Sequence, residues 1–323
     1  MRKKKLVIQR LLYNKFTMST ISVIVPATTA NIGPAFDCIG SALTMYNQFY
    51  FAKREKDESQ LNINVIGREA SKVKCDYNNL VYKAFTYLYR HIGEIPPKIS
   101  IKIKLGIPLS RGLGSSATAI IGGLIGANEL AGQPLSKLEL MNLAIKLEGH
   151  PDNVVPALFG KCQLSIKQGI DWEAYPINWH SSIIPLIVIP DFELLTEKAR
   201  SVIPKTVSID DAIFNIAHMG LLIKSLEIGN GKWLSSALQD KLHQPYRQNL
   251  IKGYDIVRQA AIRAGAYGVV ISGAGPTLLV LTSFENISSI ECATKEAWLT
   301  QAVTSETKLL SIDNCGARIN YFE

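Results

Sequence analysis

Residues 108–118 read Pro-Leu-Ser-Arg-Gly-Leu-Gly-Ser-Ser-Ala-Thr, a glycine-rich segment between two apolar ones. Before it, isoleucine and leucine occupy alternate positions of residues 99–105, as in a β-strand with one buried face. After it, small and apolar residues continue through 117–131. The pattern predicts a strand, a glycine-rich turn and a buried helix.

Such a turn leaves free backbone N–H groups at the start of the helix, where the helix dipole also favours an anion. Gly112 and Gly114 permit positive φ and let the backbone approach a phosphate closely. Ser115 and Ser116 can cap the helix, and either hydroxyl can reach a metal ion. The turn is therefore a candidate phosphate-binding loop, although an ordinary helix start capped by serine gives the same pattern.

Two common phosphate-binding motifs do not fit this turn. The Walker motif ends in Gly-Lys-Ser/Thr, and no lysine follows Gly114. The dinucleotide fingerprint Gly-x-Gly-x-x-Gly fails because Ala117 occupies the third position after Gly114. The loop is therefore of another type, and the rest of the chain has to identify it.

The net charge of +8 on 323 residues at first suggests a nucleic-acid partner. Residues 1–17, however, contain six basic residues and no acidic one. The rest of the chain carries 29 basic and 27 acidic side chains and is nearly neutral. The composition therefore gives no support for a nucleic-acid partner.

Residues 1–17 are interpreted as an untranslated or disordered extension, because folding signals begin at Ile21 and Met18 offers an alternative start. Their apolar part is too short and interrupted for a signal peptide. No stretch of about 18 apolar residues predicts a membrane span, so no membrane partner is expected. The five cysteines are scattered without a CxxC pair, which favours a reducing cytoplasm over disulfides or a zinc site.

Hydrophobic periodicity predicts alternating strands and helices from residue 21 onward. The expected strands are 21–25, 47–54, 61–66, 99–105, 183–189, 266–271 and 277–282, with one more in the last twenty residues. The expected helices are 81–90, 117–131, 136–147, 208–226, 254–264 and 287–299, with another beginning at Lys232. A boundary near residue 180 gives an N-terminal domain, 18–180, and a C-terminal domain, 181–323.

Two helices carry informative local signals. Gly122, Gly123 and Gly126 lie inside the helix expected at 117–131, where each glycine costs about 1 kcal/mol relative to alanine. We expect close packing against a sheet to offset this cost. Ser136 and Glu139 have the spacing of a capping box at the start of the next helix.

Three glycine-rich or polar segments stand at wide intervals, at residues 26–37, 108–118 and 271–277. In that order they resemble the three motifs of the galactokinase, homoserine kinase, mevalonate kinase and phosphomevalonate kinase superfamily. Within it, the chain resembles the homoserine kinases through Thr28-Thr-Ala-Asn-Ile-Gly-Pro-Ala-Phe-Asp37, His150-Pro-Asp-Asn-Val154, Thr196-Glu-Lys-Ala-Arg200 and Asp240-Lys-Leu-His-Gln-Pro-Tyr-Arg247.

The resemblance implies an α+β, two-domain small-molecule kinase fold with the active site between the domains and ATP bound by the N-terminal one. It implies transfer of phosphate from ATP to the hydroxyl of L-homoserine, a step of threonine biosynthesis, with Mg²⁺ and in a homodimer. The ATP-binding residues that it implies are Asn79, Pro108, Leu109, Ser110, Arg111, Gly112, Leu113, Gly114, Ser115, Ser116, Ala117 and Thr118.

The substrate-binding residues follow from matching homoserine, a zwitterion with one hydroxyl, to the residues of these motifs. Arg200 and Arg247 suit its carboxylate, since guanidinium groups bind carboxylates in a bidentate fork. Asp37 and Asn31 suit its ammonium group, and His150 and Thr196 suit the remaining polar atoms.

Ser116 and Glu148 are the candidate Mg²⁺ ligands, because Mg²⁺ usually takes one or two protein oxygens besides phosphate and water. The chain departs from many homoserine kinases here, since only Gly149 separates Glu148 from His150. Arg111 is a second departure, at a position where the family often has a small residue. Its side chain is expected to face solvent or the phosphates.

The candidate catalytic residues are Asn153, Arg200 and Asp152, and the identity of a base is left open. Mevalonate kinase-like relatives use an Asp–Lys arrangement, and Asn153 corresponds to one of its positions. Phosphoryl transfer through a loose transition state demands little base catalysis, so positioning and direct proton transfer to the phosphate can suffice. A salt-bridged structural role for Asp152, and a helix-capping role for Asn79, are equally consistent with the sequence.

Two alternatives compete with this interpretation. One is a kinase of the same superfamily that acts on an isoprenoid precursor or a sugar; Arg200 and Arg247 argue against it because they suit an amino-acid carboxylate. The other is a non-catalytic ligand sensor on the same fold, and the presence of Ser116 and Glu148 argues against it.

Overall fold

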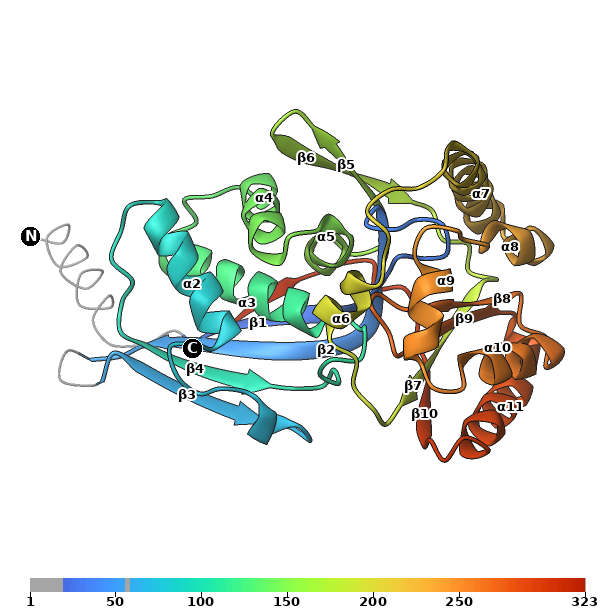
Figure 1. Ribbon diagram of the computed structural model, residues 1–323. Coiled ribbons are helices and arrows are strands. Elements are labelled where there is room, and N and C mark those ends of the chain that lie inside the picture. The colour runs from blue at the N-terminus through green and yellow to red at the C-terminus, as the bar shows by residue number, and fades with distance from the viewer. Residues whose placement is uncertain (1–19, 56–58, 323) are drawn as a thin grey trace, which may run out of the picture.

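The computed structural model describes residues 20–55 and 59–322, which fold around two β-sheets (Figure 1). Residues 1–17 and their expected lack of order lie outside the described part. The strands of the larger sheet are β1 (Thr20–Ala30), β2 (Ile39–Lys53), β3 (Leu61–Ile66), β4 (Ile99–Lys104), β5 (Cys162–Gln168), β6 (Asp171–Ile177) and β11 (Arg318–Phe322). Those of the smaller sheet are β7 (Ile184–Pro190), β8 (Gly268–Ile271), β9 (Leu278–Thr282) and β10 (Ser305–Leu309).

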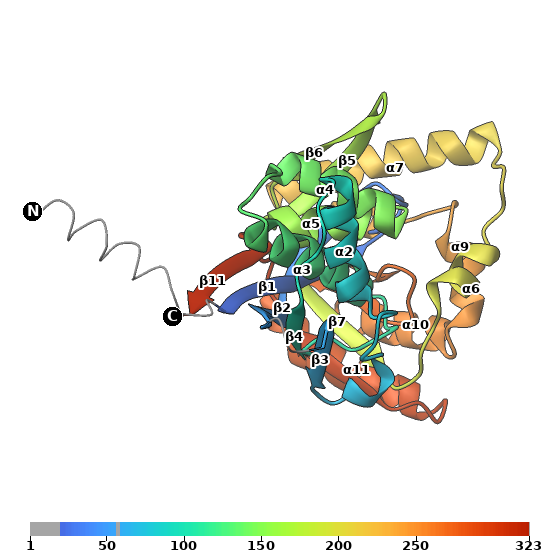
Figure 2. The ribbon, with the colours of Figure 1, turned by 90° about the vertical axis from the view of Figure 1, so that its left-hand side faces the viewer.

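Helices cover one face of the larger sheet and surround the smaller one (Figures 1 and 2). Those on the larger sheet are α2 (Leu80–His91), α3 (Ser115–Leu130), α4 (Lys137–Glu148) and α5 (Pro151–Phe159). The others are α6 (Thr196–Ser201), α7 (Ile209–Ile228), α8 (Gly231–Ala237), α9 (Gln244–Arg247), α10 (Tyr254–Arg263) and α11 (Ile287–Leu299). Short 3₁₀ turns are η1 (Ala70–Lys72), η2 (Gln248–Leu250) and η3 (Phe284–Asn286).

Sheet topology confirms the predicted α+β class. The larger sheet has the order β11-β1-β2-β4-β3, and β5 and β6 extend it from β2. The smaller sheet has the order β10-β7-β9-β8. The strand pairs are antiparallel except for β3 with β4. No helix among the described residues is long and apolar enough to cross a membrane.

The C-terminal end of the chain returns to the larger sheet. The last twenty residues hold two strands rather than the expected one, and the second, β11, pairs with β1. Residues 318–322 therefore lie in the sheet of the predicted N-terminal domain, and not in the part to which the boundary near residue 180 assigns them. Figure 2 shows β11 beside β1 at the edge of the sheet.

Several elements differ from those predicted. Strand β1 does not end at residue 25 as predicted but continues through residue 30, with a bulge after Pro26, into the polar segment 26–37. Strand β2 begins at Ile39 rather than near 47. The early start was not predicted, because Gly40 and the small residues after it do not alternate between polar and apolar. The hairpin β5–β6 and the helices α5 and α6 were not predicted. Helix α5 begins with Pro151 in a polar segment, which favours a loop by sequence pattern alone.

The glycines of α3 confirm the expected close packing. A Cβ atom at Gly122 would lie 2.4 Å from the Phe49 ring, and one at Gly126 would lie 2.4 Å from the Phe51 ring, both on β2. A Cβ atom at Gly123 would lie 2.3 Å from the carbonyl oxygen of Val81 on α2. The predicted capping box of Ser136 with Glu139 is also present at the start of α4. Helix α3 is thereby packed tightly between the sheet and α2.

Replacing Gly123 by alanine should destabilise the fold. Alanine has the better helix propensity by about 1 kcal/mol, but its Cβ would overlap a backbone carbonyl that cannot move without shifting α2. We expect a lower free energy of unfolding in urea titrations of Gly123→Ala. A variant as stable as the original chain, or more stable, would show that α2 and α3 are not packed this closely.

Candidate active site

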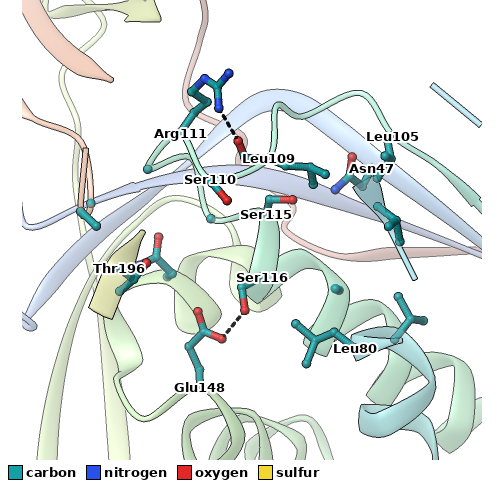
Figure 3. A pocket seen from close by; sticks show the side chains of 18 of the residues that line it. Asn47, Leu80, Leu105, Leu109, Ser110, Arg111, Ser115, Ser116, Glu148 and Thr196 are labelled. Carbon is teal, nitrogen blue, oxygen red and sulfur yellow. Dashed lines mark hydrogen bonds between the residues drawn. The ribbon is translucent and has the colours of Figure 1, made fainter. Parts of the chain in front are cut away.

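A cavity of about 320 Å³ lies between the part of the chain built on the larger sheet and the part built on the smaller one. Figure 3 shows it with the loop before α3 on one side and α6 on the other. Its polar lining includes Asn31, Asn79, Ser110, Ser115, Ser116, Glu148, His150, Asn153, Thr196, Arg200 and Arg247. Its apolar end includes Val73, Leu80 and Leu105, which lie in no local motif and were not predicted.

The loop before α3 has the backbone that its glycines predicted. Gly112 and Gly114 have φ of +73° and +66°. Gly114 is the N-cap of α3, and no side chain caps the helix, so the alternative of an ordinary helix start capped by serine is wrong. The backbone N–H groups of the first turn are therefore left for a ligand, as an anion-binding helix start requires.

The third glycine-rich segment packs directly on this loop. The Ser272 hydroxyl donates to the carbonyl oxygen of Gly112 at 2.7 Å and lies 2.9 Å from the Thr29 hydroxyl. A Cβ atom at Gly112 would lie 2.2 Å from the Ser272 carbonyl oxygen, and one at Gly114 would lie 1.9 Å from Thr28 Oγ1. The three motif segments therefore meet at one point, and glycine is needed there for packing as well as for φ.

Arg111 is buried and belongs to the cavity lining, so the solvent-facing position that was one of its two expected placements is wrong. Its guanidinium donates to the carbonyl oxygens of Pro190 at 3.2 Å, Asp191 at 3.0 Å and Leu109 at 2.9 Å. It is buried, and Figure 3 shows it directed away from Ser116 and Glu148. Arg111 thus ties the loop to the end of β7. The partners lie about 80 residues along the chain, so no local pattern could reveal this role.

Other predicted ATP-binding residues lie outside the cavity lining. Leu113, Ala117 and Thr118 are buried in the core beneath the loop. Pro108 also lies outside the lining, whereas Leu109 belongs to it.

Asn79 caps α2. Its Oδ1 accepts from the backbone N–H of Val81 at 2.9 Å, and its amide donates to the Lys74 carbonyl oxygen at 2.7 Å. It is buried at the edge of the cavity, so the capping interpretation is confirmed.

Ser116 and Glu148 meet as predicted, with the Ser116 hydroxyl donating to Glu148 Oε2 at 2.8 Å. Helix α4 ends at Glu148, and Gly149, with φ of +90°, turns the chain toward α5. Although only Gly149 separates Glu148 from His150, the Glu148 carboxylate still lies at the start of α3 (Figure 3). Burial raises the pKa of Glu148. A cation bound beside it would stabilise its ionised form.

Asp37 and Arg200 form a fork-shaped ion pair at the mouth of the cavity. The Nη2–Oδ1 and Nη1–Oδ2 distances are 2.6 Å and 3.1 Å. Asn31 does not face them with a free amide, because it donates to the Gly273 carbonyl oxygen and accepts from the backbone N–H of Asp37. Phe36 lies beneath the pair, with its ring 5.5 Å from the Arg200 guanidinium carbon.

Arg247 is a buried cation in the wall of the cavity, with 1% of its surface exposed. Its Nε donates to the Ala199 carbonyl oxygen at 3.1 Å, and its Nη1 donates to that of Gly273 at 3.0 Å. Its Nη2 makes no hydrogen bond to any residue that the structure describes. Burial, with help from the nearby Arg200, lowers the pKa of Arg247 to about 10, so it remains charged at neutral pH.

The start of α5 joins three of the predicted residues. His150 Nδ1 lies 2.7 Å from Asp152 Oδ1, and Asn153 donates to the same oxygen at 3.3 Å. The Thr28 hydroxyl donates to Asn153 Oδ1 at 2.8 Å. Asp152 is buried behind His150 and Asn153, and its Oδ2 has no partner among residues 20–55 and 59–322. The salt-bridged role considered for Asp152 is therefore present.

Family models match both halves of the chain: "GHMP kinases N terminal domain" at residues 79–161 and "GHMP kinases C terminal" at 222–298. The chain is 63% identical over 305 residues to a homoserine kinase of Crocosphaera subtropica, covering 94% of this chain and 99% of that protein. It is 56% identical to one of Microchaete diplosiphon, covering 93% and 97%. The chain belongs to the GHMP kinases.

Among the GHMP kinases the chain belongs to the homoserine kinase family. A crystal structure of homoserine kinase from Cytophaga hutchinsonii matches with a TM-score of 0.84 at 27% identity, covering 95% of this chain and 99% of that one. The L. major mevalonate kinase in complex with R-mevalonate matches with a TM-score of 0.65 at 17% identity, covering 89% and 95%, and shares the fold. The predicted two-domain kinase fold is confirmed.

The pairing of His150 with Asp152 predicts a pH-dependent contribution to stability. Burial alone would lower the pKa of His150, but the hydrogen bond and charge of Asp152 outweigh it and raise the pKa above its ordinary 6.5. Because the folded-state pKa is raised, the stabilisation is fully present below 6.5 and is lost as the pH rises through the folded-state value.

We therefore expect the loss of unfolding free energy in His150→Gln to be largest at acidic pH and to shrink as the pH rises. Urea titrations between pH 5 and 9 measure it, and His180→Gln, at an exposed histidine, is the control. A difference between His150→Gln and the original chain that does not vary with pH would contradict the prediction.

Proposed function

We propose that this protein transfers the γ-phosphate of ATP to the hydroxyl of L-homoserine, giving O-phospho-L-homoserine and ADP, a step of threonine biosynthesis. The observation that carries the proposal is one cavity that joins an uncapped helix start and a Ser–Glu pair to a cluster of guanidinium and carboxylate groups. Membership of the homoserine kinase family supports the same substrate.

The charged cluster suits a small zwitterion. Asp37 and Arg200 neutralise each other in their ion pair. A bound amino acid can replace this single pair with two, its ammonium group on Asp37 and its carboxylate on Arg200 and the free Nη2 of Arg247. His150 offers its other ring nitrogen, since Nδ1 is held by Asp152, and Thr196 offers its hydroxyl. Asn31 holds Asp37 in place through its Oδ1, which has a second lone pair to accept from the ammonium group.

The other end of the cavity suits ATP with Mg²⁺. The free N–H groups at the start of α3 would hold the phosphates, and the apolar end near Leu80 would hold the base. The hydroxyl of Ser116 and the carboxylate of Glu148 fit a Mg²⁺ ion, because both offer hard oxygen ligands and they lie side by side. When bound, the ion neutralises negative charge on the phosphates.

Catalysis then rests on positioning and charge. Arg200 and Asn153 lie in the cavity wall, where they can hold the substrate hydroxyl against the γ-phosphate and offset developing charge. The hydroxyl oxygen forms the new P–O bond as the bond to the β-phosphate oxygen breaks, and the hydroxyl proton passes to a γ-phosphate oxygen. Asp152 is too enclosed to accept this proton and serves to orient His150 and Asn153.

The test of this function is ADP release measured with Mg·ATP and each of three acceptors: L-homoserine, mevalonate and galactose. We expect L-homoserine alone to support turnover, and turnover to stop when Mg²⁺ is chelated. Turnover with another acceptor would favour the isoprenoid or sugar alternative. Binding of homoserine without turnover would favour the sensor.

Arg247→Lys should impair homoserine use while sparing ATP. Lysine keeps the charge but loses the planar fork. Losing one charge-assisted hydrogen bond costs about 1.5–3 kcal/mol, or about 10- to 150-fold in kcat/KM for homoserine. ATP affinity measured by calorimetry without homoserine should stay near that of the original chain. Equal loss of both affinities would mean that Arg247 is structural or faces the phosphates.

We further propose that the protein is a homodimer located in the cytoplasm. Helix α7 exposes Ile209, Ile213 and Ile216 by 78%, 59% and 72%, and their spacing places them on one face of the helix. Such an apolar face on an outlying helix suits a second copy of the chain (Figure 1). The five cysteines are unpaired, which suits a reducing compartment.

Ile216→Glu should therefore weaken dimerisation, because it buries a charge in the proposed contact. Sedimentation at micromolar concentration should show monomers for this variant and dimers for the original chain. The control is Ile95→Glu, at a residue that is 91% exposed in a loop after α2. A dimer that persists in Ile216→Glu would exclude this face of α7.

A further inference from the structure

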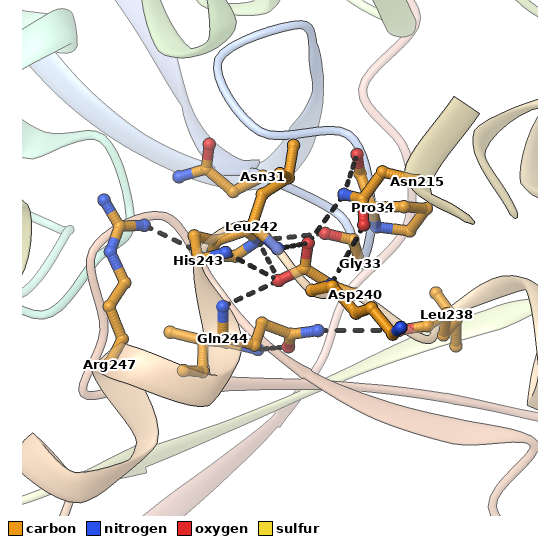
Figure 4. A network of polar contacts seen from close by, with 12 residues as sticks. Asn31, Gly33, Pro34, Asn215, Leu238, Asp240, Leu242, His243, Gln244 and Arg247 are labelled. Carbon is orange, nitrogen blue, oxygen red and sulfur yellow. Dashed lines mark hydrogen bonds and ion pairs between the residues drawn. The ribbon is translucent and has the colours of Figure 1, made fainter. Parts of the chain in front are cut away.

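A buried polar network lies beneath the substrate side of the cavity and was not assigned a role by the sequence motifs (Figure 4). At its centre, the Asp240 carboxylate has no exposed surface. Oδ1 accepts from the backbone N–H of Leu242 at 2.9 Å and from the Asn215 amide at 2.7 Å. Oδ2 accepts from the backbone N–H groups of His243 at 3.0 Å and Gln244 at 2.7 Å. Four donors therefore satisfy this charge and fix the turn before α9.

His243 projects from that turn and contacts two parts of the proposed substrate site. Its Nε2 lies 2.9 Å from the carbonyl oxygen of Gly33, and its Nδ1 lies 3.4 Å from Nη1 of Arg247. Since a carbonyl oxygen accepts and a guanidinium donates, the ring is neutral with its proton on Nε2. Burial lowers the pKa of His243, which favours this neutral form.

The loop that His243 contacts is held in a strained shape. Asn31 and Asp37, at its two ends, have φ of +59° and +55°, which non-glycine residues rarely adopt. Gly33 lies between them, and a Cβ atom there would lie 2.9 Å from the Cα atom of Leu238. The Asn215 amide donates to the carbonyl oxygen of Pro34 at 3.1 Å, next to the contact from His243. His243 and Asn215 thus bind two successive carbonyl oxygens of the loop, those of Gly33 and Pro34.

The ring of Phe36 contacts both His243 and Arg247. Its ring stacks on the imidazole of His243 with centroids 5.2 Å apart, and it lies 5.1 Å from the guanidinium carbon of Arg247. The same ring supports Arg200. The position of His243 therefore determines where the loop, Phe36 and Arg247 can sit relative to one another.

We propose that His243 is a positioning residue for the acceptor substrate, with Asp240 holding it in place. His243 orients Arg247 on one side and the loop carrying Asp37 on the other, and so sets the spacing between the groups that receive the carboxylate and the ammonium of an amino acid. The inference rests on the proposed function, because it assigns those two groups to the substrate. It predicts an effect on homoserine and not on ATP.

Two amide variants separate the two contacts of His243. Gln places a donor near the position of Nε2 and can keep the bond to Gly33, but it has no acceptor at the position of Nδ1. Asn does the reverse and keeps an acceptor for Arg247. We expect each variant to raise the homoserine KM about fivefold, the effect of one hydrogen bond, while the ATP KM stays within about twofold. His243→Ala loses both contacts and should raise the homoserine KM further.

The matched control is Asn286→Ala, which removes a side-chain bond to the Gly265 carbonyl oxygen in the same half of the molecule, away from the cavity. It should lower the melting temperature without changing the homoserine KM. If the Gln and Asn variants of His243 change the homoserine KM no more than this control does, or raise both KM values equally, the positioning role is wrong.

A double-mutant cycle tests whether His243 acts through Arg247. Because the two side chains are in contact, His243→Gln combined with Arg247→Lys should raise the homoserine KM by clearly less than the product of the single effects. Multiplicative effects would contradict action through Arg247.

Nitrogen-15 NMR of histidine-labelled protein gives a readout that does not depend on activity. We expect the His243 ring to show the neutral form with its proton on Nε2 at pH 7. A doubly protonated ring would overturn the assignment. If the original chain fails to phosphorylate homoserine but the ring shows this form, then the proposed function has failed and the geometry of the network stands.

Discussion

The contact between Ser272 and Gly112 is the point on which the rest of the site depends. One hydroxyl joins the loop before α3 to the third glycine-rich segment and to Thr29 of β1. Glycine is required there because any Cβ atom would meet the backbone of the facing segment. The parts of the chain built on the two sheets are thereby in direct backbone contact. As a result, the start of α3, which suits phosphate, and the arginines that suit a carboxylate face the same cavity.

Charge is arranged in layers around that cavity. At its mouth, Asp37 and Arg200 neutralise each other and remain partly exposed, so they can exchange partners with a ligand. Deeper in the wall, Arg247 is held by carbonyl oxygens, which leave its charge uncompensated and available. Below both lies Asp240, whose charge is fully used by donors around it. The ion pair and Arg247 can therefore bind a ligand, whereas Asp240 has a structural role.

Much of this arrangement could be predicted from the sequence. The glycine-rich loop, the meeting of Ser116 with Glu148 and the α+β class follow from local patterns and from a resemblance carried by several motifs. The burial of Arg111 could not be predicted, because its carbonyl partners at Pro190 and Asp191 lie far along the chain. His243 stood inside a recognised motif, yet its role depends on Gly33, which is 210 residues away. Helix α5 was missed because its first residues are polar and begin with proline.

The return of the chain to its first sheet bears on how the protein forms during synthesis. Strand β1 is among the first described residues to leave the ribosome, and β11, its neighbour on one side, is the last. Until residues 318–322 emerge, that edge of β1 lacks its partner strand and presents unpaired N–H and C=O groups. Closure of this edge of the larger sheet therefore waits for residues 318–322, and a nascent chain stalled before them would carry an open strand edge.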